Sequence, residues 1–201
     1  MAAVVLLSVS FTACKKNEDS GSGGGYQITA YVENGISSIA TVKALLDGTT
    51  LATAKYSNDS FSISLPVPGS QHLEEIEDGF NGCFLDGFYA YDGSGNMLGL
   101  ILYGKMEGDF MTLGEYVYAD SDFEFHGSED GVTVDVSGKK GWNLFYMISD
   151  DPDFETGTLT TQKQSNMLWI FASGSSVASS KLHSAVSMGL KFMKIKQIEN
   201  K

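Results

Sequence analysis

The sequence predicts an all-β domain, an antiparallel β-sandwich of the immunoglobulin-like or a related type, with a short and less regular C-terminal tail. Three observations predict this class. Polar and apolar residues alternate in short segments from Tyr26 onward, and turn residues interrupt them about every ten residues. Aromatic residues make up 11% of the chain and only three prolines occur, a composition that suits pleated strands.

The predicted strands follow one another between residues 26 and 172. Most end at a turn signal, of which Asn34-Gly35 and Asp47-Gly48 are clear examples. The stretch 69–82 is the least strand-like: Leu73–Asp78 could form one helical turn or a loop, and a subdivision of the domain, if present, falls near 66–83. The predicted strands are Tyr26–Glu33, Ile39–Leu46, Leu51–Tyr56, Ser60–Leu65, Phe84–Tyr91, Met97–Lys105, Gly114–Ala119, Asp122–His126, Val132–Val136, Trp142–Ile148, Gly157–Thr161 and Met167–Ala172.

The chain changes character after the last predicted strand. Residues 173–180 are rich in Ser and Gly and predict a linker, so the all-β domain is expected to span 26–180. Residues 181–201 form a Lys-rich tail with five lysines and one acid, for which a helix and a final strand are both open. The residues that could share a helix face are Val186, Leu190, Met193 and Ile198.

The N-terminus has the pattern of a targeting segment. An apolar run ends directly at Cys14; it is too short for a permanent transmembrane helix, which needs about 20 residues, and has the size of a signal-peptide core. Thr12 and Ala13 before the cysteine resemble a bacterial lipobox, which implies acylation of Cys14. We therefore expect a signal peptide over 1–13, then a lipidated cysteine and flexible tether over 14–25, with the lipid contacting the membrane. A cleaved secretory peptide with an ordinary cysteine is the alternative.

The charge of the chain excludes one large class of partners. The formal net charge is −12, and every one of the 13 basic residues is Lys. A chain without Arg lacks the planar guanidinium that binds phosphate through two hydrogen bonds, and its negative charge repels polyanions, so nucleic acid is not expected as a partner. The domain is more acidic than the whole chain: residues 26–180 hold 22 acids and six lysines, a charge of −16, whereas the tail carries +4.

Two acidic clusters are the candidates for metal binding. Carboxylates suit Ca²⁺ and an imidazole suits transition metals, but successive same-face residues of a strand lie about 7 Å apart, too far for all of them to reach one ion. We favour a solvated face opposite Phe123 and Phe125 for the first cluster and an acidic surface turn for the second, and we expect no metal or cofactor. The clusters are Asp120, Asp122, Glu124 and His126, and Asp150, Asp151, Asp153 and Glu155.

Aromatic residues are the candidates for ligand contact. Trp142 and Trp169 stand in predicted strands, where a buried anchor of the core is the favoured interpretation because each ring buries a large area. The alternative is a platform on which an exposed ring stacks against the apolar face of a sugar. Further candidates by residue type are Tyr89, Tyr91, Tyr116 and Tyr118.

Signals of catalysis are missing from the sequence. His72, His126 and His183 are far apart, and no zinc-protease, P-loop, dinucleotide or serine-hydrolase motif occurs. We interpret Cys83 as a small buried hydrophobe, which forms no disulfide within the chain if Cys14 is acylated. Two carboxylates suffice for a glycosidase, so a glycan-active hydrolase stays open as the alternative to a non-enzymatic protein.

Three segments resemble a group of small cell-surface lipoproteins of Bacteroidetes-type bacteria: Tyr116–Asp122, Gly138–Asn143 with Lys-Lys-Gly-Trp-Asn, and Thr160–Trp169 with Thr-Thr and Leu-Trp. Lys15-Lys16 with Glu18-Asp19 resembles the surface-export signal of such lipoproteins. The resemblance implies an all-β domain on the bacterial outer membrane and supplies no catalytic residues. We expect a lipid-anchored, non-enzymatic envelope protein with a binding or adhesion role toward a glycan or a protein. The alternatives are the hydrolase and a structural accessory of an outer-membrane complex.

Overall fold

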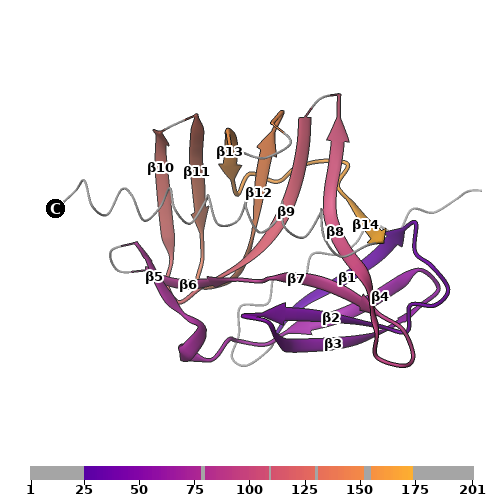
Figure 1. Cartoon of the computed structure of the whole chain (residues 1–201). Helices are drawn as coiled ribbons and strands as arrows, with labels where there is room; N and C mark the ends of the chain where they lie inside the picture. Colours follow the sequence, from indigo (N-terminus) through magenta and orange to yellow (C-terminus); the bar gives the residue numbers. More distant parts are fainter. Residues whose placement is uncertain (1–24, 78–79, 109, 130, 152–154, 174–201) are drawn as a thin grey trace, which may run out of the picture.

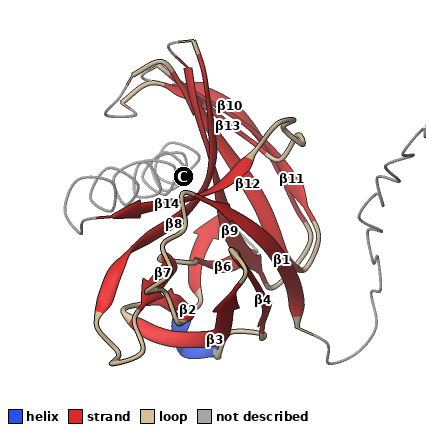
Figure 2. Cartoon of the chain, turned by 90° about the vertical axis from the view of Figure 1, so that its right-hand side faces the viewer, coloured by secondary structure: helices blue, strands red, loops and turns tan. Residues whose placement is uncertain are grey.

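The computed structural model describes residues 25–77, 80–108, 110–129, 131–151 and 155–173 (Figure 1). These residues form strands and one short 3-10 turn, η1 (Ser70–His72), so the all-β prediction is confirmed (Figure 2). The strands are β1 (Tyr26–Glu33), β2 (Thr41–Leu46), β3 (Thr49–Ser57), β4 (Ser60–Leu65), β5 (Glu74–Glu77), β6 (Phe80–Phe84), β7 (Gly87–Tyr91), β8 (Met97–Glu107), β9 (Phe110–Ala119), β10 (Phe123–Glu129), β11 (Val132–Gly138), β12 (Gly141–Ser149), β13 (Gly157–Thr160) and β14 (Leu168–Ser173).

Both ends of the chain lie outside the described residues. Residues 1–24 include Cys14, the predicted signal peptide and most of the predicted tether, and residues 174–201 include the predicted tail. Within the described part of the chain, no helix has the length and apolar character needed to cross a bilayer.

Seven strands close into a ring. In order around it they are β8, β14, β1, β4, β3, β2 and β7, and β7 pairs back to β8. The ring closes through a short parallel pairing in which Val32 of β1 lies opposite Trp169 of β14. Alternate side chains fill the interior of the ring, and on β1 these are Ile28, Ala30 and Val32. The first apolar core lies here, because one face of each amphipathic strand points inward.

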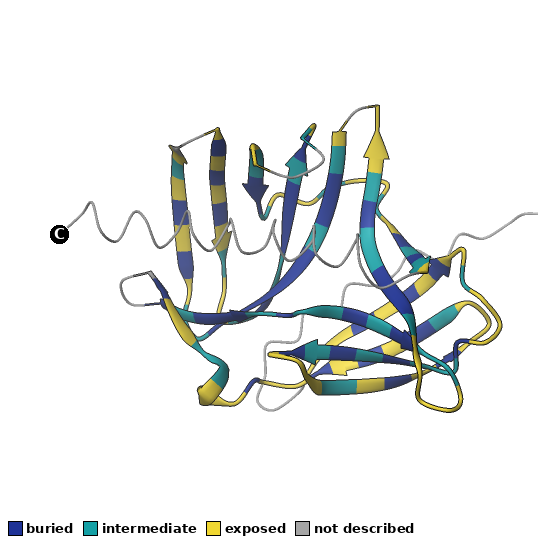
Figure 3. Ribbon diagram, in the orientation of Figure 1, coloured by how far each residue is buried: buried dark blue, intermediate teal, exposed yellow. Residues whose placement is uncertain are grey.

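The remaining strands extend the same sheet away from the ring. Beyond β8 follow β9, β12, β13, β11 and β10, while β6 and β5 branch from β9 (Figure 1). We call the six strands β8, β9, β12, β13, β11 and β10 the open sheet. On β11, Val132, Val134 and Val136 are buried, and the residues between them are exposed (Figure 3). The buried face of the open sheet carries a second apolar core, to which Phe125 and Phe145 also belong.

A sandwich of two separate sheets is not confirmed. Every described strand belongs to one continuous hydrogen-bonded sheet, since the long strand β8 takes part in both the ring and the open sheet. Consecutive residues of β8 accordingly point into different cores: Leu100 belongs to the second and Ile101 to the first.

The stretch near 66–83 is where the local structure differs from expectation. A helical turn or loop was one expectation for Leu73–Asp78, but Glu74–Glu77 forms the short strand β5, which pairs with β6. Apolar anchors explain the difference: Ile76 is buried, and the Phe80 ring stacks on Phe123 of β10 at a centroid distance of 4.9 Å. Packing of these side chains against residues that are distant in the sequence therefore decides the structure of this segment, whose local sequence pattern is weak.

Candidate functional site

The indole of Trp169 lies inside the ring of strands, among other aromatic side chains. Its centroid is 5.2 Å from that of Phe88, 5.6 Å from Phe61, 4.9 Å from Tyr103 and 6.4 Å from Tyr116. Only 9% of Trp169 is exposed. Trp169 therefore acts as a core anchor and presents no open face to a sugar.

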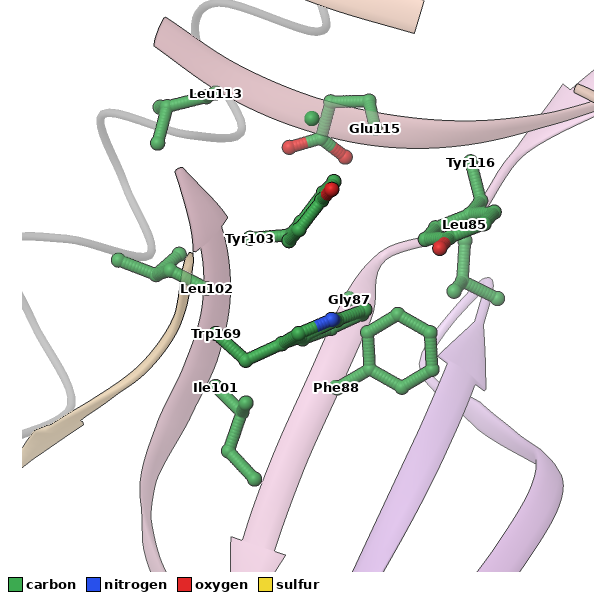
Figure 4. Close-up of a pocket in the computed structure, with 11 residues that line it drawn as sticks. Leu85, Gly87, Phe88, Ile101, Leu102, Tyr103, Leu113, Glu115, Tyr116 and Trp169 are labelled. Carbon is green, nitrogen blue, oxygen red and sulfur yellow. The ribbon is translucent and has the colours of Figure 1, made fainter. Parts of the chain in front are cut away.

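A small cavity lies beside Trp169, at the place where β8 and β9 diverge (Figure 4). Its volume is about 20 Å³, which is enough for about one water molecule and far below the roughly 300 Å³ of a ligand pocket. Tyr103, Tyr116 and Phe88 line it together with Glu115 of β9. The cavity can hold a water but not a sugar ring.

Glu115 is the buried acid of the described part of the chain. Its exposed fraction is 9%, its cross-strand neighbour is Phe145, and no described residue donates a hydrogen bond to its carboxyl. Burial raises the pKa of Glu115 from 4.5 to about 8, because an ionised carboxylate is poorly solvated there. At pH 7 this group is mainly a neutral acid. No second carboxylate lines the cavity among the described residues, so the paired acids of a glycosidase are not assembled there.

Trp142 is also a core anchor. Its indole Nε1–H donates a hydrogen bond of 2.9 Å to the carbonyl of Pro66, and its ring packs edge-on against Tyr118 at 5.6 Å. Trp142 and Tyr118 are buried, as is Tyr116. The other two tyrosine candidates are half-buried on β7, where the Lys43 ammonium lies 4.1 Å from the ring centre of Tyr91 and the Tyr89 hydroxyl points to a backbone carbonyl.

The first acidic cluster is divided among three separate groups. Asp120 accepts hydrogen bonds from the backbone and the side-chain amide of Asn81, both 2.9 Å long. Asp122 pairs with the Lys139 ammonium at 2.8 Å. The hydrogen bond from the Asn81 side chain lowers the pKa of Asp120, and the hydrogen bond from the Lys139 ammonium lowers the pKa of Asp122.

The third group of this cluster is centred on His126. Its ring nitrogens lie 2.9 Å from a Glu124 oxygen and 2.7 Å from an Asp135 oxygen, all on the exposed face of β10 and β11. Hydrogen bonds that the ring donates to the carboxylates of Glu124 and, to a smaller extent, Asp135 raise the pKa of His126. Phe123 and Phe125 are buried on the opposite face, as their alternation with the acids predicts. Among the described residues no group of three potential ligands is arranged to hold a metal ion.

The second acidic cluster is a turn after β12. The Asp151 carboxylate accepts a 2.7 Å hydrogen bond from the backbone N–H of Glu155, and Asp150 is exposed. Asp153 lies outside the described residues. The carboxylate of Asp151 is thus used to hold the backbone of the turn.

Cys83 is a buried free thiol, which confirms its interpretation as a small hydrophobe. Burial, with smaller contributions from Asp47 and Asp86, raises its pKa to about 12. At neutral pH the thiolate is therefore absent, and the group is a poor nucleophile.

One exposed aromatic ring lies on a polar strand surface. Tyr31 of β1 is 63% exposed, on the outer side of the ring of strands. Its cross-strand neighbour is Ser60 of β4. We call this surface the Tyr31 face, and it consists of Gln27, Thr29, Tyr31, Ser60, Ser62 and Ser64.

Three polar side chains of the Tyr31 face are hydrogen-bonded to one another, and the exposed carboxylate of Glu33 follows Tyr31 on the same side of β1. The Gln27 amide donates to the Ser62 hydroxyl at 2.6 Å, and the Thr29 hydroxyl lies 2.9 Å from the same oxygen. This ordered row of hydroxyl and amide groups keeps further donor and acceptor capacity toward solvent.

A carboxylate stands at one end of the Tyr31 face. The turn between β3 and β4 places Asn58 and Asp59 at φ of 52° and 54°, a left-handed conformation that Asn and Asp tolerate well. The Asp59 carbonyl accepts a 2.7 Å hydrogen bond from the N–H of Val32, next to Tyr31, and its carboxylate lies 3.4 Å from the Tyr56 hydroxyl. Burial raises the pKa of Tyr56, and the nearby carboxylate of Asp59 adds to the effect.

Sequence reasoning missed both Tyr31 and Glu115. The signal for Tyr31 was present, because the alternation over Tyr26–Glu33 assigns Tyr31 to the polar side together with Gln27 and Thr29. Glu115 gave no such signal: β9 is buried on both faces, so alternation does not distinguish an inward acid from an outward one.

No protein-family model, curated protein or solved structure matches this chain. The resemblance to Bacteroidetes-type lipoproteins therefore rests on the three sequence segments, and it stays a prediction.

Proposed function

We propose that this protein is a lipid-anchored, surface-exposed protein of the bacterial outer membrane, and that it binds a glycan through the Tyr31 face without catalysing a reaction on it. The observation that carries the glycan proposal is the ring of Tyr31, 63% exposed on a polar strand surface. An aromatic ring contacts the apolar C–H face of a sugar, and hydroxyl, amide and carboxylate groups around it pair with the sugar hydroxyls.

The position of the Tyr31 face agrees with a lipid anchor on Cys14. Tyr31 belongs to β1, the first described strand, which begins twelve residues after Cys14. A tether of that length spans at most about 40 Å when extended. The domain would then stand off the membrane with this face within reach of surface polysaccharide.

A binding role is supported over hydrolysis by the states of the acids. A general acid needs a raised pKa and a partner carboxylate across a cleft. Glu115 has the raised pKa, but it lies beside a cavity of only about 20 Å³. Asp122, which precedes β10, and Glu124 on β10 are both exposed, and a hydrogen bond from Lys139 lowers the pKa of Asp122.

The glycan proposal is tested on a glycan array, followed by calorimetry with the strongest hit. We expect Tyr31→Ala to lose binding by at least tenfold and Tyr31→Phe, which keeps the ring, to retain most of it. Phe110→Ala is the matched control, because Phe110 is 52% exposed on the β8–β9 hairpin, away from this face. Binding that survives Tyr31→Ala, or a glycan array without hits together with a stoichiometric protein partner, would refute the proposal.

The anchor is tested separately by membrane fractionation and intact-mass measurement. We expect the wild-type protein to sediment with membranes and to carry the added mass of acyl chains. Cys14→Ser removes the acylated atom and should release the protein into the soluble fraction. Membrane retention of Cys14→Ser with unchanged mass would overturn the lipid anchor and leave the glycan test unaffected.

A further inference from the structure

The outermost strand of the open sheet, β10, has one unpaired edge within the described part of the chain. It stands at the end of the strand order, and β11 is the only described strand that pairs with it (Figure 1). The register with β11 runs without a bulge from Phe123 to Glu129, and the strand contains neither Pro nor Lys, which often protect such edges. An edge of this kind is a template for a further strand.

The backbone groups of alternate residues of β10 are directed away from β11. Glu124 lies opposite Ser137 of β11, and the N–H of Ser137 donates to the Thr161 hydroxyl at 3.0 Å. Glu124 and Ser137 therefore form one of the pairs that exchange no backbone hydrogen bonds, and such pairs alternate with hydrogen-bonded ones in an antiparallel ladder. By this alternation, the N–H and C=O groups of Glu124, His126 and Ser128 point outward, where a second strand can bind them.

We propose that the edge of β10 binds the same edge of a second copy of this chain, so that the two strands pair antiparallel about a two-fold axis and the open sheets of two molecules join. A two-fold axis places the same residues on both sides of an interface. Residues that face each other across the strands must both have outward backbone groups. The allowed registers are therefore those that match members of the set Glu124, His126 and Ser128 with one another.

The charges on β10 favour one of these registers. With Phe125 on the two-fold axis, Glu124 of each copy lies opposite His126 of the other copy, so the pair occurs twice. With His126 on the axis, the two His126 rings face each other and each Glu124 faces Ser128. Opposite charges across strands stabilise the pairing, whereas like charges destabilise it. The edge is thus complementary to itself in the register centred on Phe125.

The surroundings of His126 support its positive charge at this position. Its ring nitrogens lie 2.9 Å from a Glu124 oxygen and 2.7 Å from an Asp135 oxygen, and these hydrogen bonds raise its pKa. All three side chains are exposed, and Asp135 is the neighbour of His126 on β11. In the proposed dimer the ring lies between Asp135 of its own chain and Glu124 of the second copy. The Nε2–H, which now donates to Glu124 of its own strand, can then donate to the Glu124 carboxylate of either copy.

The strength of the dimer follows from what the edge adds. Phe125, on the axis, is already 6% exposed in the single chain. Pairing therefore adds backbone hydrogen bonds and ion pairs more than apolar contact. Interfaces that bury little apolar surface are typically weak and transient. We expect a reversible dimer that depends on protein concentration.

The test is sedimentation velocity of the full chain over a series of concentrations, at about pH 6, below the raised pKa of His126. All proteins carry Cys14→Ser, which excludes disulfide-linked dimers through that residue. We expect Glu124→Lys, which puts a lysine opposite His126 twice, to weaken the dimer at least tenfold. Combining it with His126→Glu reverses both charges and should restore the dimer.

The control for this test is Glu107→Lys, which makes the same charge change at an exposed site on the β8–β9 hairpin. It should leave the association unchanged. A monomer at every concentration, or a dimer that Glu124→Lys weakens no more than Glu107→Lys does, would overturn the proposal.

A disulfide measurement covers the case in which a charge-reversed variant fails to fold. Protein with Glu124→Cys is mixed with protein carrying His126→Cys, both exposed positions, in the Cys14→Ser background; Cys83 is buried. Facing Cα atoms of a hydrogen-bonded antiparallel pair lie about 5.5 Å apart, within the range of a disulfide. Under mild oxidation we expect the disulfide between the two different proteins to form in preference to the one that joins two His126→Cys copies. The opposite preference, or no disulfide at all, would contradict the self-complementary edge.

Discussion

The buried acid Glu115 gives the protein a pH dependence of stability that can be worked out in sign and size. In the folded state its pKa is about 8, against 4.5 for the ordinary group. Between these values the unfolded chain is ionised and binds fewer protons than the folded chain, so stability falls as the pH rises. Each pH unit in that interval costs about 1.4 kcal/mol. Because the slope is only partial close to each pKa, stability should fall by about 3.5 kcal/mol from pH 5 to pH 8 through Glu115 alone.

The substitution Glu115→Gln isolates this contribution, because Gln has the shape of the neutral acid and does not titrate. We expect the variant to match the wild type at pH 5 and to be more stable by about 3.5 kcal/mol at pH 8. The assay is urea unfolding followed by tryptophan fluorescence, with both proteins in the Cys14→Ser background. Glu75→Gln is the control, since Glu75 is exposed on β5. An equal difference between variant and wild type at both pH values would refute the assignment of Glu115 as a buried neutral acid.

Three further predictions follow from individual contacts. Trp142→Ala should destabilise the fold by about 3–5 kcal/mol, whereas Trp142→Phe, which loses chiefly the 2.9 Å hydrogen bond, should cost about 1–2 kcal/mol in urea unfolding. Gly138→Ala should lower the melting temperature because its Cβ would overlap the facing phenylalanine ring, while Gly93→Ala, which has open space around it, should be neutral. His126 should titrate above 6.5 by NMR and shift downward in Asp135→Asn; its stabilisation is present below pH 6.5 and lost as the pH rises through the raised pKa.

Local alternation predicts most strands of this protein and little of their arrangement. The segment from Tyr26 to Glu33 has one buried and one solvated face, and its predicted bounds are those of β1. The strand pairings that close the ring, in contrast, join segments that are far apart in the sequence. The parallel contact of Val32 with Trp169 joins residues 137 positions apart, and period-2 patterning holds no information about such a partner. A sandwich and a continuous, partly closed sheet therefore look alike in the sequence.

Burial on both faces limits what the sequence shows about the candidate residues. In β9 and β12 the alternate positions point into two different cores: Tyr116 and Trp142 into the first, Val117 and Phe145 into the second. Spacing alone could not decide whether Trp142 faces inward or outward, since both sides of β12 are largely buried. The same property conceals Glu115, whose neighbours in the strand are apolar on both sides.

The alternation that fails in the middle of the chain is informative at its beginning. Where one side of a strand is exposed to solvent, an aromatic side chain on that side is not buried by folding. Core packing therefore does not explain why an aromatic residue occurs there. Tyr31 is such a residue, whereas the tryptophans, which composition marks as the stronger ligand candidates, are explained by packing alone. In an all-β sequence, the polarity of the residues at i−2 and i−4, which lie on the same side of the strand, is therefore a better indicator of a ligand-contacting aromatic residue than the size of its ring. Here those neighbours are Thr29 and Gln27, and they direct attention to β1 rather than to Trp142 or Trp169.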